Sequence, residues 1–129
     1  LYMELVKCTP QYWEFVRVLR NDERVQSGFI KSNPISPKDQ EYYMHDNAHH
    51  YRIALVDGEP AGYVGVIADD IRVCTHPDYQ GKGVGKFMIT EIMKEYPTAF
   101  AKVKLDNEAS LRLFRSCGFK KKFYILTKD

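Results

Sequence analysis

Gln80-Gly81-Lys82-Gly83-Val84-Gly85-Lys86 is the stretch of this sequence that decides the fold. It follows a run typical of a strand, residues 71–75, and opens a run typical of a helix, residues 84–96. Its glycines let backbone amides approach a ligand closely, and a helix start carries free N–H groups and a partial positive charge. Lys82 and Lys86 add mobile positive charge. The stretch therefore predicts a site for a pyrophosphate.

Two familiar phosphate motifs do not fit these residues. A Walker A loop needs glycine at position 80 and Ser or Thr at position 87, where Gln80 and Phe87 stand. A Rossmann fingerprint needs a third glycine at position 86, which is lysine. A plain glycine-rich connection is the alternative, but the glutamine, the two lysines and the strand–helix context together favour an anion site.

The order of elements around this stretch predicts the fold class. Strands are expected at residues 1–7, 51–56, 61–67, 71–75, 98–105 and 119–127, with a hairpin at Asp57-Gly58. Helices are expected after Thr9-Pro10, after the capping box Ser36-Pro37-Lys38-Asp39, over residues 84–96 up to Pro97, and from the cap Asn107 to Gly118. This order predicts one α+β domain over residues 1–129, an α/β sandwich with a central mixed sheet.

Composition narrows the class of protein. The chain has 129 residues, 44% hydrophobic and 28% charged, which is typical of one globular domain. A net charge of +2 is too small to argue for a nucleic-acid partner, and the lysine run 120–122 is better explained as a solvated strand start. No signal peptide and no apolar run of about 20 residues is visible. The three widely spaced cysteines favour reduced thiols in the cytoplasm.

Two segments together resemble the GNAT superfamily of acetyl-CoA-dependent N-acetyltransferases. Gln80, Gly83 and Gly85 match its signature of Gln or Arg, two residues, Gly, one residue, Gly or Ala. Residues 107–119, Asn-Glu-Ala-Ser-Leu-Arg-Leu-Phe-Arg-Ser-Cys-Gly-Phe, match its Asn-capped helix that ends in Gly-Phe. The resemblance implies the GNAT fold, with a twisted sheet flanked by helices and two splayed parallel strands that hold the cofactor.

The resemblance also implies a set of residues that bind acetyl-CoA. The backbone amides of the turn would hold the pyrophosphate, and the strand before it would pair with the pantetheine arm. The amide of Val73 would polarise the thioester carbonyl as a single-donor oxyanion hole. The expected cofactor-binding residues are Val73, Thr75, Gln80, Gly81, Lys82, Gly83, Val84, Gly85, Lys86, Asn107, Ser110 and Phe114, and no metal is expected.

Acetyl transfer to an amine needs a base. An aliphatic amine with a pKa near 10.4 is neutral in about one molecule in a few thousand at pH 7, which adds roughly 4.6 kcal/mol to the barrier. Asp69 or Asp70 is the candidate base, and Asp69 is expected on the same strand face as Ile71 and Val73. A polar turn between two strands explains the same pair equally well.

The general acid is the clearest departure from the family. The family often has a Tyr in the last helix to protonate the leaving thiolate, and Phe114 stands at that position. Tyr124 or a water is the candidate substitute, and a thiol of pKa about 8.5 also leaves tolerably without full protonation.

The resemblance therefore implies an acyltransferase that moves acetyl from acetyl-CoA to a primary amine by direct attack. An amino sugar, a small-molecule amine and a protein N-terminus all remain open as acceptors, and the chain is expected to be a monomer or homodimer. Arg20 or Arg24 is a candidate for meeting a phosphate or carboxylate of the acceptor. The alternative from another class is a non-catalytic acyl-CoA-binding sensor or scaffold.

Overall fold

An antiparallel sheet of four strands, in the order β1-β2-β3-β4, forms the centre of the molecule. The strands are β1 (Met3–Lys7), β2 (Tyr51–Val56), β3 (Glu59–Ile67) and β4 (Asp70–Thr75). This computed structural model describes residues 1–31 and 33–129. The predicted hairpin is confirmed, because Asp57 and Gly58 join β2 to β3 with φ of 49° and 85°, as a tight two-residue turn requires.

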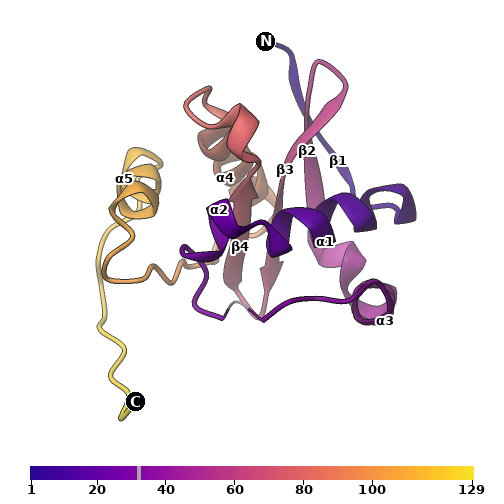
Figure 1. The fold of residues 1–129 in the computed structure, drawn as a ribbon. Helices are drawn as coiled ribbons and strands as arrows, with labels where there is room; N and C mark the ends of the chain where they lie inside the picture. The colour runs from indigo at the N-terminus through magenta and orange to yellow at the C-terminus, as the bar shows by residue number, and fades with distance from the viewer. Residues whose placement is uncertain (32) are drawn as a thin grey trace.

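Helices cover both faces of this sheet (Figure 1). They are η1 (Pro10–Tyr12), α1 (Trp13–Asn21), α2 (Glu23–Gln26), α3 (Pro37–Asn47), η2 (Ala48–His50), η3 (Pro77–Tyr79), α4 (Val84–Glu95) and α5 (Glu108–Ser116). Helices α1 and α3 pack on one face, and α4 packs on the other. The α+β class predicted from the sequence is confirmed, but the sheet of the described residues is antiparallel throughout rather than mixed, with one isolated parallel bridge beside it.

Alternation along β2 creates a core on each face. Ile53 and Leu55 point into the layer with α1 and α3, while Ala54 and Val56 point into the layer with α4. Burial of both faces explains why β2 reads as a continuous apolar run rather than as a polar–apolar alternation.

Two of the predicted helix caps form side-chain hydrogen bonds, whereas Thr9, at the start of η1, forms none. Ser36 Oγ accepts a hydrogen bond from the Asp39 N–H at 3.1 Å at the start of α3. Asn107 Oδ1 accepts one from the Ser110 N–H at 3.0 Å at the start of α5. Such caps satisfy backbone donors that the first turn of a helix leaves free.

The two strands expected after α4 do not form in the described residues. Residues 98–105 pair with β4 only at a parallel bridge between Asp70 and Phe100, and residues 119–127 pair with no strand. The reason lies in strand pairing, which is a tertiary property. Residues 101–105 leave β4 after the bridge, so residues 119–127 find no neighbouring strand.

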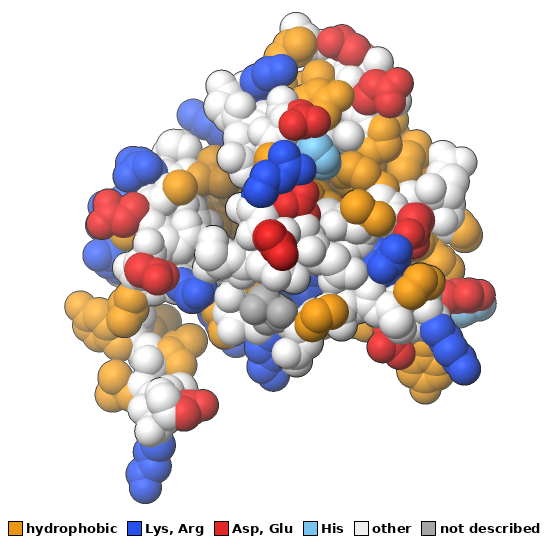
Figure 2. Space-filling model, viewed as in Figure 1, with side chains coloured by type: hydrophobic (Ala, Val, Ile, Leu, Met, Phe, Trp, Pro, Cys, Tyr) orange, Lys and Arg blue, Asp and Glu red, His pale blue; other side chains and the backbone are white. Residues whose placement is uncertain are grey.

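Residues 120–129, which we call the arm, extend away from the sheet (Figure 1). Phe123 is 91% exposed and Leu126 is 90% exposed, and Figure 2 shows the apolar side chains of the arm standing out from the body. No backbone N–H of the arm donates a hydrogen bond to another described residue. Among the described residues, no helix has both the length and the apolar character to cross a membrane.

Candidate cofactor and acceptor site

The outer edge of β4 carries free backbone amides. Ile71 N–H donates to Phe100 on this edge at 2.9 Å, and His76 N–H donates to Ala61 of β3 on the opposite side at 2.7 Å. Because N–H groups alternate sides along a strand, the amides of Val73 and Thr75 point to the same outer edge as that of Ile71. Residues 101–105 have already left this edge, so both amides face the opening between them and β4.

The turn after β4 presents a second set of free amides. No backbone N–H from Gly81 to Lys86 donates a hydrogen bond to another described residue, and Phe87 is the first to do so, to Gly83. Gly83 begins α4 with φ of 84°, a left-handed conformation that favours glycine. A Cβ atom added at Gly81 or Gly83 would meet no atom within 4 Å, so the space before these amides is open.

Positive charge surrounds these amides. Lys82 and Lys86 are both exposed, and Lys82 Nζ lies 5.4 Å from the centroid of the Tyr79 ring. Together with the N-terminal end of the twelve-residue helix α4, they form a site suited to a pyrophosphate. This geometry fits the cofactor that the sequence predicts.

Helix α5 closes the site from the other side. Gly85 packs so tightly against α5 that a Cβ atom there would lie 2.9 Å from Leu113 Cδ2 and 3.5 Å from Thr75 Oγ1. Asn107 caps α5, and its Nδ2 would lie 3.1 Å from a Cβ atom at Gly28. The segment after α2 therefore reaches across the opening beside β4.

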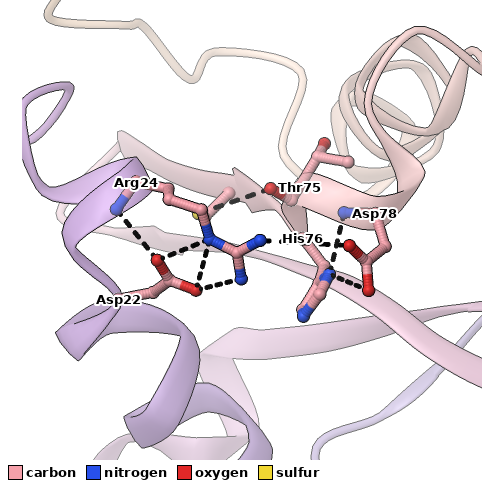
Figure 3. Close-up of polar contacts among 6 residues, drawn as sticks. Asp22, Arg24, Thr75, His76 and Asp78 are labelled. Atoms are coloured by element: carbon pink, nitrogen blue, oxygen red, sulfur yellow. Dashed lines mark hydrogen bonds and ion pairs between the residues drawn. The ribbon is translucent and has the colours of Figure 1, made fainter.

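A polar cluster lies where β4 ends (Figure 3). Arg24 donates to Asp22 from Nε at 3.0 Å and from Nη2 at 2.6 Å, and its Nη1 lies 3.9 Å from Asp78 Oδ1. These hydrogen bonds lower the pKa of Asp22 to about 2. Arg24 is thus engaged by Asp22, which removes it as a free anion-binding group.

His76 lies beside the candidate site, although the sequence alone predicted no role for it. It directly follows Thr75, and its Nδ1 accepts a hydrogen bond from the Asp78 N–H at 3.0 Å (Figure 3). The neutral ring therefore carries its proton on Nε2. Phe15 stacks on the ring with a centroid distance of 6.4 Å. The sequence does place His76 between the predicted strand 71–75 and the glycine-rich turn, and this position could have marked it as a candidate.

The two candidate base residues lie at the far end of β4. Asp69 is in the turn before β4 with φ of 65°, and its carboxylate accepts from Thr98 Oγ1 at 3.3 Å. The expectation that it shares a strand face with Ile71 is therefore wrong. Asp70 begins β4 and accepts from Arg72 Nε at 3.3 Å. At about 3.3 Å per residue, Asp70 lies about 10 Å along the strand from Val73.

The candidate site residues from the last third of the chain lie in three different environments. Phe114 is 5% exposed and packs edge-on against Phe119 at a centroid distance of 5.2 Å, so its ring belongs to the core. Ser110 is half-buried in the first turn of α5, beside Asn107. Tyr124 is 87% exposed and belongs to the arm, which extends away from the sheet (Figure 1).

Two buried thiols, Cys74 on β4 and Cys8 at the opposite edge of the sheet after β1, are poor nucleophiles. Burial raises the pKa of Cys74 to about 12 and that of Cys8 to about 11. Because only a thiolate attacks, a covalent acetyl-cysteine relay has no support from this geometry. Within residues 1–31 and 33–129, no three His, Cys, Asp or Glu side chains are grouped so that they could hold a metal ion.

Comparison with known proteins places these features in a family. The sequence pattern of the Acetyltransferase (GNAT) family matches residues 13–119, which include the strand, the turn and α5. The chain belongs to this family. The GNAT turn thus lies between the open edge of β4 and the first turn of α4, where both sets of free amides occur.

Individual relatives agree with this assignment. The chain is 26% identical over 104 residues to the N-alpha-acetyltransferase RimI of Mycobacterium tuberculosis, an alignment that covers 72% of this chain and 66% of RimI. It is 36% identical over 70 residues to the mycothiol acetyltransferase of Nocardiopsis dassonvillei, covering 50% of this chain and 19% of that protein. The chain thus spans just under two thirds of the first relative's length and much less of the second's.

A solved structure shares the fold. The spermidine N-acetyltransferase of Vibrio cholerae, solved in complex with CoA and spermine, superposes with a TM-score of 0.83 at 18% identity. The match covers 95% of this chain and 83% of that one. At this identity the likeness shows the GNAT fold.

Proposed function

We propose that this chain is an N-acetyltransferase that moves the acetyl group of acetyl-CoA to a primary amine. The observation that carries the proposal is the row of unpaired amides, Val73 and Thr75 on the edge of β4 and residues 81–86 in the turn. In the related spermidine N-acetyltransferase, the bound molecules are CoA and an amine.

The two sets of amides would bind different parts of acetyl-CoA. Residues 81–86, with Lys82 and Lys86, would bind the pyrophosphate through backbone N–H groups and charge. The backbone amide of Thr75 would pair with the pantetheine arm of acetyl-CoA. The thioester at the end of this arm is the group that supplies the acetyl. The amide of Val73 would donate to the thioester carbonyl, where negative charge develops during attack, and one such donor is worth about 2.7–4 kcal/mol. The pantetheine arm would also lie next to the side chains of Gln80, Asn107 and Ser110.

Proton transfer would follow a longer route. Asp70 and Asp69 stay the proposed bases, and their position at the start of β4 means that water must carry the proton from the amine. His76 directly follows Thr75, so the Nε2–H of its neutral ring would be a further hydrogen-bond donor at this end of β4. The unpaired thiols of Cys8, Cys74 and Cys117 support a reducing compartment, the cytoplasm.

The second candidate function is a non-catalytic acyl-CoA-binding module. The observation that favours it is Phe114, a buried core residue with no proton to give, at the position where the family often has Tyr.

The test measures free thiol released from acetyl-CoA against a panel of primary amines, with calorimetry of acetyl-CoA binding in parallel. The transferase proposal predicts binding and amine-dependent release. Binding without release on any amine would support the sensor, and no binding at all would contradict both.

A further inference from the structure

Arg20 is a half-buried arginine whose charge has no anionic partner among the described residues. It lies at the end of α1, and its guanidinium carbon is 5.7 Å from the centroid of the Phe29 ring. The two neighbouring arginines differ, because Arg17 is paired with Glu14 and Arg24 with Asp22. A half-buried guanidinium without a carboxylate partner is suited to binding an external anion.

Arg20 lines a cavity of about 310 Å³ between α1, α3 and the segment that joins α2 to α3. Lys31 adds a second positive charge to its lining, and Asp39 is the one acidic side chain among the described residues there. The lining thus carries a net positive charge. The volume lies at the lower end of the range for small-molecule sites.

The walls of the cavity hold their polar groups in place. Gln40 is 3% exposed, and its Nε2 donates to the Trp13 carbonyl at 2.9 Å. The hydroxyl of Tyr43 is hydrogen-bonded to that of Tyr51 at 2.8 Å. Because these groups are already fixed, Arg20 is left as the strong donor that a ligand can recruit.

Arg20 lies on α1, which packs on the sheet face that holds the Cys74 side chain of β4, since Leu19 of α1 and Cys74 belong to one buried cluster. The charge of Arg20 counteracts the burial that raises the pKa of Cys74 on β4, and it does the same for Tyr51 and Tyr63. Cys74 stands between Val73 and Thr75, whose amides face the open edge. A ligand bound to Arg20 therefore lies on the same side of the sheet as the Cys74 side chain of β4.

We propose that the acceptor is an amine that also carries an acidic group, a carboxylate or a phosphate, and that Arg20 with Lys31 binds this group in the cavity. The proposal rests on the proposed transferase function. It names the acceptor class as amino acids, amino-sugar phosphates or similar molecules, in preference to polyamines, whose positive charges would be repelled.

The test compares kcat/KM for matched amines that differ only in the acidic group. One pair is an amino acid and its amide, and the other is glucosamine 6-phosphate and glucosamine. The preferred acid identifies carboxylate or phosphate as the natural group. We expect the wild type to prefer the acidic member of at least one pair by about 10- to 100-fold, the range for a charge-assisted hydrogen bond.

Arg20→Gln should erase this preference through a higher KM for the acidic amine, with the neutral amine unaffected. Arg20→Lys should keep part of it, because the charge remains while the bidentate geometry is lost. Arg24→Gln is the matched control, since Arg24 is held by Asp22, and it should keep the full preference. Equal use of both members by the wild type, or an equal loss on both in Arg20→Gln, would overturn the proposal.

A second readout separates this proposal from the transferase function. Inorganic phosphate and acetate are titrated, without acetyl-CoA, against the Nε–Hε NMR signal of Arg20. A saturable shift with at least one anion, lost in Arg20→Gln and kept in Arg24→Gln, supports the anion site even if no amine is acetylated. No shift of the Arg20 signal with either anion would overturn it.

Discussion

A Cβ atom at Gly85 would lie 2.9 Å from Leu113 Cδ2, so α4 and α5 touch where no side chain fits. This contact joins the two segments that the family resemblance rests on, the turn and the Asn-capped helix. It places Gly85 between α5 and Thr75, the last residue of β4.

The contact predicts a coupled pair of mutations. Gly85→Ala should destabilise the protein by about 1–3 kcal/mol, since the added methyl group overpacks the interface. Leu113→Ala should remove the clash, so the double variant should be more stable than the sum of the single effects by about 0.5–3 kcal/mol. Urea unfolding of the four proteins measures the coupling, and additive effects would contradict the contact.

The Asp22–Arg24 pair predicts a pH dependence. Hydrogen bonds from Arg24 hold the pKa of Asp22 at about 2, below its usual value near 3.9. A carboxyl with a lowered pKa stabilises the fold above its unfolded pKa, and that contribution is lost as pH falls from about 4 to about 2.

Arg24→Ala should raise the pKa of Asp22 towards its usual value, and Arg24→Lys should give an intermediate value. A carbon-13 NMR titration of the Asp22 carboxyl measures this directly. The same pKa in Arg24→Ala as in the wild type would show that another group holds Asp22.

The three thiols should react at very different rates. Burial raises the pKa of Cys74 to about 12 and that of Cys8 to about 11, so at pH 8 few of these groups are thiolates. Cys117 is half-buried, and we expect it to give the fast phase of labelling by a disulfide reagent. Cys117→Ser should remove that phase, whereas fast labelling of Cys74 would reopen the acetyl-cysteine route.

The arm should contribute little to stability or turnover. Its side chains are largely exposed, so deletion of residues 120–129 should change the free energy of unfolding by about 0.5 kcal/mol or less. Tyr124→Phe should keep kcat within about twofold of the wild type, because the hydroxyl lies outside the site. A general acid contributes about 10²- to 10⁴-fold, so a loss of that size would restore Tyr124 as the acid.

Local signals in the sequence predicted the local parts of the structure. The hairpin at Asp57-Gly58 and the caps Ser36 and Asn107 depend on nearby residues alone, and all are confirmed. The strands at 98–105 and 119–127 depend on which neighbour each finds, and neither forms in the described residues beyond the bridge at Phe100.

The site divides in the same way. The free amides of the turn could be predicted from the sequence, because the glycines and lysines stand at the start of a helix and the first N–H groups of a helix have no partner within it. The position of Asp69 depends on where the turn ends and β4 begins. The strand begins at Asp70, and Asp69 has the positive φ of a turn residue, so the alternation of strand faces does not extend to it. Asp22 pairs with Arg24, while Arg20 lies over the Phe29 ring. Which arginine takes the carboxylate depends on side-chain packing that the spacing of residues in the sequence does not encode.

The central claim is that the turn from Gly81 to Lys86 binds the pyrophosphate of acetyl-CoA, and Gly83 tests it most directly. Gly83 has φ of 84° with open space before it, and Asn and Asp both tolerate this conformation and have equal size. Gly83→Asn and Gly83→Asp therefore differ only in charge. Calorimetry should show that Gly83→Asp binds acetyl-CoA at least about fivefold more weakly than Gly83→Asn, because a carboxylate about 4 Å from a phosphate costs about 1 kcal/mol or more. Equal affinity of the two variants would contradict the claim.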